Sequence, residues 1–437
     1  MRVLVIGAYG LIGGYVVARL LAEGHAVTAA GRDIEAASRT LPPARWPQMR
    51  WARVDLATAT VEDWRPLLAD AQAVVNCAGA LQDGPRDDLA AVHRDGVARL
   101  VAACVQAGVR RLVHISAAGV AADRGLGAQG DRFNDTKLAT ETLLRASGLD
   151  WIILRPGLVL APAAYGGSAL LRGLAAFPGV LPVVHAGATV QVVAATDVAR
   201  AVAKAVLPDT PAARSIDLVH DEAVTLADVV LTLRSWLGLP PARLWHVPAG
   251  VARLAAKGAD ALAWAGWRSP LRTATLDQLR GGIAGDGRAM ERDLAIRPLS
   301  LADMLAAHPA GVQERWFAKS YFLKPAMLAL FWILSGLIGF CRVPEATAVL
   351  TAAGMARMPA TLFVLLGSAI DLALGVGVVF RRRTKAALLG MVAVSGAYMV
   401  GGTLWRPDLW LDPMGPFLKT LPAAMLALAA LALLDER

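Results

Sequence analysis

The apolar residues of positions 1–154 follow two alternating patterns. Short β-branched runs are typical of buried strands, and the longer stretches between them have the spacing of amphipathic helices. The runs are expected to form strands that end at Ile6, Ala30, Leu56, Gly79, Ser116 and Leu154. This alternation predicts an α/β fold with a Rossmann-type doubly wound parallel sheet. Residues 158–310 carry shorter elements and are expected to form a small substrate-side subdomain.

After position 324 the pattern changes to long apolar runs with few charges. Four runs approach the roughly 20 residues that a helix needs to cross a bilayer, and they lie at 325–341, 360–380, 386–405 and 416–434. The sequence therefore predicts a domain at 1–310, a linker at 311–324 and a four-helix transmembrane bundle at 325–437. Residues 342–358 are expected to form a short surface or re-entrant helix. Buried helices of a soluble domain are the alternative.

Charge sets the orientation expected for this bundle. Arg381, Arg382, Arg383 and Lys385 lie between the second and third runs, and loops rich in Arg and Lys stay in the cytoplasm. A multi-pass protein of the cell (inner) membrane is predicted, with a cytoplasmic N-terminal domain. Asp371 is the acidic residue within the runs. A proton or quinone contact, a helix–helix hydrogen bond and protonation in place are all open interpretations of it.

Composition agrees with this division into two domains and argues against some classes of function. Of the 437 residues, 56% are hydrophobic and 18% are charged, and the chain is too long for one ordinary domain. The net charge of +9 comes from dispersed arginines and one basic loop, a distribution that argues against nucleic-acid binding. The three cysteines and seven histidines lack the spacing of metal ligands, so no metal site is expected.

The first strand runs into three glycines spaced three apart, and a helical pattern follows. This order is typical of the phosphate-binding corner of a dinucleotide fold. Gly7 would allow the tight turn, Gly10 the close approach of a pyrophosphate, and Gly13 the packing of helix on strand. The helix N-terminus supplies N–H donors for the phosphates. Further contacts with the cofactor are expected from Tyr9, Leu11 and Ile12.

Residues at the other strand ends bear on which cofactor binds. Arg32 follows the second strand, where an arginine suits the 2′-phosphate of NADP, while Asp33 keeps NAD open. Asp55, beside Leu56, either accepts a hydrogen bond from the adenine amino group or caps a helix. The fourth strand ends in small residues, which would let the backbone pass under the cofactor at Ala78 and Gly79. NADP is the expected cofactor and NAD the alternative.

These motifs resemble the extended or atypical branch of the short-chain dehydrogenase/reductase superfamily. Within that branch the chain is similar to the NmrA-like proteins and to the NADPH-binding accessory subunit of respiratory complex I. The resemblance covers roughly residues 1–300 and rests on the glycine turn, Asp55-Leu56, Asn76 to Gly79, Ser116 and Arg155-Pro156-Gly157. It implies that Lys137 and Pro156 also hold the nicotinamide dinucleotide and that Ser116 lies near the reacting carbonyl.

The family's catalytic motif is Tyr-x-x-x-Lys, and this chain departs from it. The lysine position is Lys137, but the tyrosine position is Phe133, which has no ionisable proton. In one interpretation the domain is an NAD(P)-dependent oxidoreductase with Ser116 and Lys137 in the site, and Tyr165, a bound water or the substrate supplies the proton. In the other, the domain binds NADP(H) without turnover, as a sensor or a structural subunit of a membrane assembly.

The apolar tail is similar in helix arrangement and length to the DoxX-like family of small membrane modules. This similarity implies the lipid bilayer as a partner and points to a membrane redox partner or a quinone as a further one. Together the two resemblances predict a membrane-tethered NAD(P)(H)-binding oxidoreductase of the atypical short-chain type. Its expected substrate is a hydrophobic or membrane-derived carbonyl or hydroxyl compound.

Overall fold

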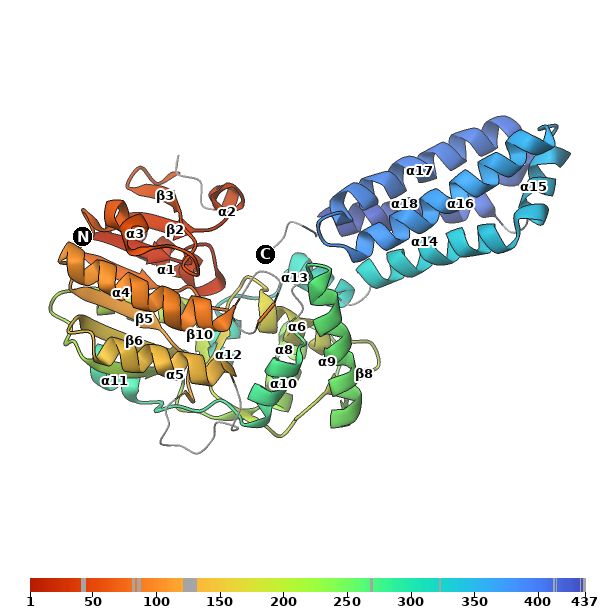
Figure 1. Ribbon diagram of the computed structural model, residues 1–437. Coiled ribbons are helices and arrows are strands. Elements are labelled where there is room, and N and C mark those ends of the chain that lie inside the picture. Colours follow the sequence, from red (N-terminus) through yellow and green to blue (C-terminus); the bar gives the residue numbers. More distant parts are fainter. Residues whose placement is uncertain are drawn as a thin grey trace. The chain divides into compact units, whose positions relative to one another are not determined.

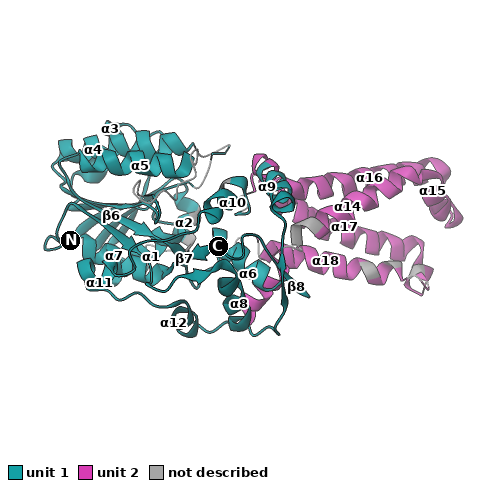
Figure 2. Ribbon diagram, turned by 90° about the horizontal axis from the view of Figure 1, so that it is seen from below, with its two compact units in different colours: residues 1–260, 270–311 teal, residues 261–269, 312–437 magenta. Residues whose placement is uncertain are grey.

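The computed structural model divides into two compact units (Figure 2). Unit 1 comprises Met1–Asp260 with Pro270–Gly311, and unit 2 comprises Ala261–Ser269 with Val312–Arg437. The residues that the structure describes are 1–40, 45–80, 83–84, 88–120, 132–267, 270–321, 324–411, 413, 415–432 and 434. The predicted linker at 311–324 contains helix α13 (Val312–Ser320), and its residues 322–323 lie outside the described ones.

Parallel strands form the seven-stranded main sheet of unit 1 (Figure 1). Their order is β11-β6-β5-β4-β1-β2-β3, and every neighbouring pair runs parallel. The order confirms the predicted doubly wound Rossmann-type sheet. The winding reverses between β1 and β4, the position where such sheets bind their ligands. The strands are β1 (Arg2–Ile6), β2 (Ala26–Gly31), β3 (Met49–Arg53), β4 (Ala73–Asn76), β5 (Arg111–Ile115), β6 (Asp150–Pro156) and β11 (Arg214–Leu218).

Helices cover both faces of this sheet, as Figure 2 shows. One face carries α1 (Leu11–Ala22), α7 (Ala195–Ala205) and α11 (Ala289–Leu294), and the other carries α3 (Val61–Leu68), α4 (Gly96–Ala107) and α5 (Arg132–Arg145). On the first face Val17 and Val202 are fully buried in one apolar core. On the second face Trp64, Leu100 and Leu144 are fully buried in another. Burial of each large side chain contributes about 1.5–3 kcal/mol, so the two cores hold the strand ends in place.

Shorter elements make up the remainder of unit 1, where the sequence predicts a small subdomain. They form three two-stranded sheets, which pair β10 with β7, β12 with β9 and β13 with β8. These strands are β7 (Leu158–Leu160), β8 (Val180–Val183), β9 (Thr189–Val190), β10 (Val192–Ala194), β12 (Val224–Thr225) and β13 (Arg243–His246). The helices are α2 (Ile34–Thr40, between β2 and β3), α6 (Gly166–Ala175), α8 (Leu226–Trp236), α9 (Ala249–Trp264, which ends in unit 2), α10 (Thr273–Arg280) and α12 (Leu301–Ala306).

Long apolar helices form most of unit 2 (Figure 1). Small residues let two of them pack closely: a Cβ on Gly336 would lie 2.7 Å from the Ser368 carbonyl oxygen, and a Cβ on Gly375 would lie 2.8 Å from the Ile333 nitrogen. Close backbone approach of this kind is typical of helices packed within membranes. The helices after α13 are α14 (Lys324–Cys341), α15 (Val343–Ala352), α16 (Arg357–Val379), α17 (Thr384–Trp405) and α18 (Pro416–Ala432).

The structure supports fewer membrane spans than the four predicted. In the described part of the chain, α16 and α17 alone are each long and apolar enough to cross a bilayer. Helices α14 and α15 pass that test only as a pair bent by 82°, which makes three spans if the pair is one. The apolar part of α18 is shorter, Thr420–Ala432, and contains Pro422. The re-entrant or surface helix expected at 342–358 corresponds to α15.

Asp371 on α16 joins three helices of unit 2. The Ser335 hydroxyl of α14 donates to its Oδ2 at 2.7 Å, and the Tyr398 hydroxyl of α17 donates to its Oδ1 at 2.8 Å. The Asp371 side chain is buried, with 6% exposure of the residue. Of the interpretations left open by the sequence, the geometry supports the helix–helix hydrogen bond. A proton or quinone contact stays a prediction.

Candidate functional site

The glycine turn lies where β1 ends, at the point of reversal in the sheet. Gly7 has φ +72°, a left-handed conformation that glycine adopts without strain. A Cβ on Gly7 would lie 2.7 Å from the Ala78 nitrogen, and a Cβ on Gly13 would lie 2.1 Å from the Gly7 carbonyl oxygen. The Gly10 N–H donates to the same oxygen at 3.0 Å. The turn therefore keeps a narrow geometry that any side chain at Gly7 or Gly13 would disturb.

Helix α1 begins directly after this turn, and its first turn is suited to an anion. Gly10 is its N-cap and provides no side-chain hydrogen bond, and the first turn contains no acidic residue. The N–H groups of Leu11, Ile12 and Gly13 have no acceptor within the helix, as at every helix N-terminus. Their dipoles point toward a ligand at the carboxyl end of β1, where phosphate groups bind in this fold. The site thus fits a dinucleotide.

Tyr9 connects the glycine turn with the end of β2. Its ring packs against Gly31, where an added Cβ would lie 2.3 Å from the Tyr9 Cε1 atom. Arg32 and Asp33 follow immediately, with Arg32 half-buried and Asp33 exposed. This edge of the glycine turn is where the adenosine ribose lies in Rossmann-type sheets. Tyr9 and Arg32, predicted from the sequence as cofactor contacts, are therefore brought to one place.

Asp55 stabilises a turn after β3. Its Oδ1 accepts a hydrogen bond from the Ala57 N–H at 3.0 Å. The following helix, α3, is capped by Thr60 in a reciprocal pair with Asp63, so the alternative of Asp55 as a helix cap is wrong. The Leu56 carbonyl lies against the backbone of α4, 2.2 Å from where a Cβ on Gly96 would be. Contact of Asp55 with adenine stays a prediction.

His93 supports the small residues that follow β4. It lies in a π-helical segment, Ala90–Asp95 (η2), and its Nε2 accepts a hydrogen bond from the Ala80 N–H at 3.1 Å. The Thr136 hydroxyl donates to the Phe133 carbonyl, so it accepts from His93 Nδ1 at 2.9 Å. Burial, with Lys137 nearby, lowers the pKa of His93 to about 3. This neutral imidazole fixes the backbone beside Gly79.

Lys137 is a buried cation beside Gly79. Its Nζ donates to the Ile115 carbonyl at 2.9 Å and would lie 3.5 Å from a Cβ on Gly79. The same Nζ is 6.0 Å from the centre of the Phe133 ring, which occupies the position of the family's tyrosine. Desolvation lowers the pKa of Lys137 to about 8, against the opposing charge of Glu141. The ammonium form therefore predominates at neutral pH, next to the backbone expected to lie under the cofactor.

This pKa predicts how NADPH affinity depends on pH in the full chain. Because the pKa of Lys137 is lowered, its ammonium is present below about pH 8 and lost above it. If the ammonium holds the cofactor, affinity should fall by up to about tenfold per pH unit above that point. Isothermal titration between pH 6.5 and 9.5 measures this. Lys137→Met should bind more weakly with no such slope, and an equal slope in this variant would contradict the role.

Ser116 directs its hydroxyl into the protein. It donates to Glu141 Oε1 at 2.7 Å, and Glu141 is fully buried on α5. Arg155 binds the same carboxylate through two hydrogen bonds of 2.9 and 2.5 Å, and Arg145 adds a third at 2.8 Å. The Ser116 proton is thus already engaged, which leaves only the oxygen lone pairs for a substrate. A role for Ser116 at the reacting carbonyl stays a proposal.

Two further predicted residues, Pro156 and Tyr165, differ in their contacts. Pro156 ends β6, and its carbonyl accepts a hydrogen bond from the Ala118 N–H at 2.9 Å, which connects the ends of β5 and β6. Tyr165 precedes α6 and is 39% exposed. Among the described residues it makes no hydrogen bond or ring contact with Ser116 or Lys137. Pro156 is therefore part of the strand-end site, and a catalytic role of Tyr165 has no contact to support it.

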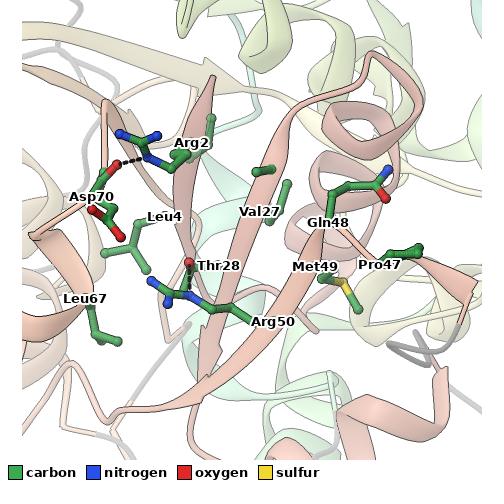
Figure 3. A pocket seen from close by; sticks show the side chains of 13 residues that line it. Arg2, Leu4, Val27, Thr28, Pro47, Gln48, Met49, Arg50, Leu67 and Asp70 are labelled. Carbon is green, nitrogen blue, oxygen red and sulfur yellow. Dashed lines mark hydrogen bonds between the residues drawn. The ribbon is translucent and has the colours of Figure 1, made fainter.

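Glu141 and His93 are the site residues that the sequence did not single out. Glu141 lies four positions after Lys137, so their common helix face was foreseeable. His93 lacked any such signal, because its place depends on a π-helical segment. A separate cavity of about 210 Å³ lies near the opposite ends of β1, β2 and β3, lined by Arg2, Thr28 and Arg50 among others (Figure 3). It is not the dinucleotide site, which lies at the carboxyl ends of the strands.

Two known families match the chain. The family described as NAD(P)H-binding matches residues 7–207, and the DoxX-like family matches residues 329–428. A relative from Streptomyces sp, 3-diazoavenalumate denitrifying reductase, is 32% identical over 272 residues, which are 58% of this chain and 86% of the relative. The chain belongs to the NAD(P)H-binding reductases of the short-chain type and carries a DoxX-like C-terminal domain.

Solved structures agree with this fold. UDP-glucuronic acid 4-epimerase from Bacillus cereus, with UDP-glucuronic acid and NAD, is 17% identical with a TM-score of 0.54, and the match covers 74% of this chain and 100% of that one. NADPH-dependent quinone oxidoreductase from Escherichia coli, with NADPH, is 19% identical with a TM-score of 0.54, covering 70% and 99%. By relationship the chain is an NAD(P)-dependent oxidoreductase-type enzyme that binds a nicotinamide dinucleotide, with a membrane-associated C-terminal region.

Proposed function

We propose that this chain is a membrane-tethered, NADP(H)-dependent reductase of the atypical short-chain type. Its substrate would be a hydrophobic or membrane-derived carbonyl compound, or the corresponding hydroxyl compound in the reverse direction. The observation that carries the proposal is Lys137, a buried ammonium beside Gly79, in a chain that continues into apolar helices. A carbonyl that partitions into the bilayer would reach a tethered reductase at a high local concentration.

The residues that would hold the cofactor follow the carboxyl ends of the strands. The first turn of α1 would bind the pyrophosphate, and Arg32 would pair with the 2′-phosphate, which favours NADP over NAD. Lys137 would donate to the nicotinamide ribose, and Ala78 and Gly79 would let the backbone pass close by. When bound, the cofactor supplies a hydride. The protein's own contribution is to orient that group and the carbonyl and to exclude water.

The group that protonates the product must differ from the tyrosine that the family uses. Phe133 cannot donate a proton, and burial with a neighbouring cation keeps His93 neutral, with a pKa of about 3. Tyr165, a bound water or the substrate itself remains as the donor. The names of two relatives, 3-diazoavenalumate denitrifying reductase and NADPH-dependent quinone oxidoreductase, are those of reductases. A quinone is accordingly among the substrates to be offered.

The orientation in the membrane follows from charge. Arg381, Arg382, Arg383 and Lys385 lie between α16 and α17, and such basic loops stay in the cytoplasm. We place the N-terminal unit in the cytoplasm and the apolar helices in the cell membrane. A redox partner is expected within the bilayer.

A second function has one observation in its favour. Phe133 removes the family's proton donor while the glycine turn and Lys137 are retained, which is the pattern expected of a domain that binds NADP(H) without using it. Such a chain would act as a sensor or as a structural subunit of a membrane assembly.

Restoring the tyrosine separates the two functions. Full-length wild type and Phe133→Tyr, each in lipid nanodiscs, are supplied with NADPH and a panel of hydrophobic aldehydes, ketones and quinones, and NADPH oxidation is followed. A reductase predicts turnover in the wild type and an increase of up to about 100- to 10,000-fold in the variant, the usual contribution of one general acid. Tight NADPH binding with no turnover in either protein would favour the sensor and contradict the reductase.

A further inference from the structure

Unit 2 contains a cavity of about 200 Å³ near the connection between α16 and α17. It is bounded by the C-terminal ends of α13, α16 and α18, the N-terminal parts of α14 and α17, and Trp267, all within unit 2. Most of its wall is apolar or aromatic. The lining includes Trp267, Phe317, Tyr321, Leu328, Arg381 and Leu388.

Arg381 is the cation of this wall, and the backbone fixes its position. Its N–H donates to the Ala265 carbonyl at 2.9 Å, and its Nη2 donates to the Leu434 carbonyl at 3.0 Å. The guanidinium lies 5.8 Å from the centre of the Trp267 ring, and the Trp267 Nε1 donates to the Val379 carbonyl at 2.6 Å. These contacts hold a half-buried positive charge in place at the cavity.

No carboxylate neutralises this charge among the residues that the structure describes. The Leu434 carbonyl oxygen accepts a hydrogen bond from the guanidinium, but it carries no net charge. A partly buried cation without a counter-ion is costly, and an anion in the cavity would relieve that cost. The exposed neighbours Arg382, Arg383 and Lys385 also lack an acidic partner within the described ranges, and they add to the positive potential around Arg381.

The other residues that line the cavity indicate which kind of anionic molecule would bind. Leu328 and Leu388 are buried apolar residues of helices α14 and α17, and Trp267 and Phe317 add aromatic surface. Tyr321, outside the spanning helices, has its pKa raised to about 12 by burial, so its phenol stays neutral at physiological pH. Aromatic and basic residues together are typical of the boundary between headgroups and acyl chains. An anionic amphiphile matches this combination better than a free inorganic anion.

We propose that this cavity binds the headgroup of an anionic phospholipid, with its phosphate against Arg381. The cavity has room for the phosphate and part of the glycerol, and the acyl chains would continue along the exposed apolar faces of the neighbouring helices. The site is separate from the dinucleotide site of unit 1, and lipid binding there does not depend on whether the enzyme turns over.

Lipid selectivity of the full-length protein in detergent tests this site. Dioctanoyl phosphatidylglycerol, dioctanoylglycerol, which lacks the phosphate, and inorganic phosphate are titrated separately, and bound molecules are counted by native mass spectrometry. Wild type should prefer phosphatidylglycerol to dioctanoylglycerol by about tenfold, the size of one charge-assisted contact, and should not retain inorganic phosphate. Arg381→Gln should lose the preference. Arg382→Gln removes an equal charge from the exposed neighbour and should keep it.

Arg381→Lys separates charge recognition from folding. Lysine keeps the charge but not the guanidinium contacts with the backbone, so we expect the preference for phosphatidylglycerol to persist, reduced by no more than about threefold. Three results would overturn the proposal: equal selectivity in Arg381→Gln and Arg382→Gln, loss of selectivity in Arg381→Lys as complete as in Arg381→Gln, or retention of phosphate as tight as that of the lipid.

Discussion

Replacing Gly13 by alanine is expected to weaken NADPH binding roughly 10- to 100-fold, because steric conflict at such a position costs about 1–3 kcal/mol. The added Cβ would lie 2.1 Å from the Gly7 carbonyl oxygen, and both partners are backbone or bonded directly to it. The turn must therefore move away from the helix. The N–H groups that would bind the phosphates move with it, so the affinity for NADPH decreases.

Gly14 provides the matched control for this substitution. It is the next residue of the same helix, and a Cβ there would lie 3.9 Å from the Ala8 carbonyl oxygen, an ordinary contact. Gly14→Ala should leave NADPH affinity within about twofold of wild type and should stabilise α1 slightly, since alanine is the better helix former. Isothermal titration of both full-length variants with NADPH measures the difference. Equal affinities in the two variants would mean that the turn does not bind the cofactor.

Glu141→Gln is expected to destabilise unit 1 by about 3 kcal/mol or more, the usual cost of breaking a buried ion pair. Glu141 is fully buried and accepts hydrogen bonds from Arg155, Arg145 and Ser116. Glutamine keeps the shape but removes the charge that neutralises Arg155. We expect the temperature at which NADPH binding is lost on heating to fall by roughly 6–10 °C.

The dependence of stability on acidic pH provides a second test of the role of Glu141. Burial alone would raise its pKa, but hydrogen bonds from Arg155 and Ser116 and the nearby arginine charges outweigh burial and lower it. Its contribution to stability is therefore complete above the ordinary glutamate value of 4.5 and is lost as the pH falls through the lowered value. The stability of Glu141→Gln should therefore decrease less than that of the wild type as the pH is lowered.

Asp150→Asn is the control for the Glu141 substitution. It removes the same kind of charge from an exposed pair with Arg110, 3.3 Å apart. Exposed pairs contribute little to folding, so the melting temperature and the acid profile should match those of the wild type. If Glu141→Gln behaved like this control, the buried carboxylate would not be the centre of an ion-pair network.

Local patterns in the sequence were sufficient to predict the sheet and the phosphate turn. The strand before Gly7, the spacing to Gly13 and the helical pattern after it are all short-range features, and backbone geometry largely determines them. Lys137 was placed by its spacing from Phe133 on one helix. These parts of the fold and site could be predicted because each is specified within about 20 residues of chain.

Contacts between distant segments could not be predicted in this way. The sequence suggested a substrate-facing Ser116, but its hydroxyl bonds to Glu141, which lies on another element. His93 reaches the backbone after β4 from a π-helical segment without a sequence signature. Arg381 was interpreted as a topology signal, and its position beside Trp267 depends on a pairing of segments more than 100 residues apart. Side-chain orientation at a site is set by tertiary packing.

The predicted number of membrane spans differs from the structure for another reason. Apolar run length predicted four, because each run approached 20 residues. Helix α14, which corresponds to the first run, passes the test for a span only together with α15, from which it is bent by 82°, and the apolar part of α18 is a shorter helix that contains Pro422. Hydropathy reports the apolar composition of a segment, but it does not report where a helix ends or bends.

Transfer of deuterium from NADPH labelled at the hydride position of its nicotinamide ring tests the central claim most directly. Full-length protein in nanodiscs is incubated with the labelled cofactor and hydrophobic carbonyl compounds, including an extract of membrane lipids, and the products are examined by mass spectrometry. The proposed reductase predicts one deuterium in the product for each NADPH oxidised. Tight binding of the cofactor with no deuterium in any product would contradict it.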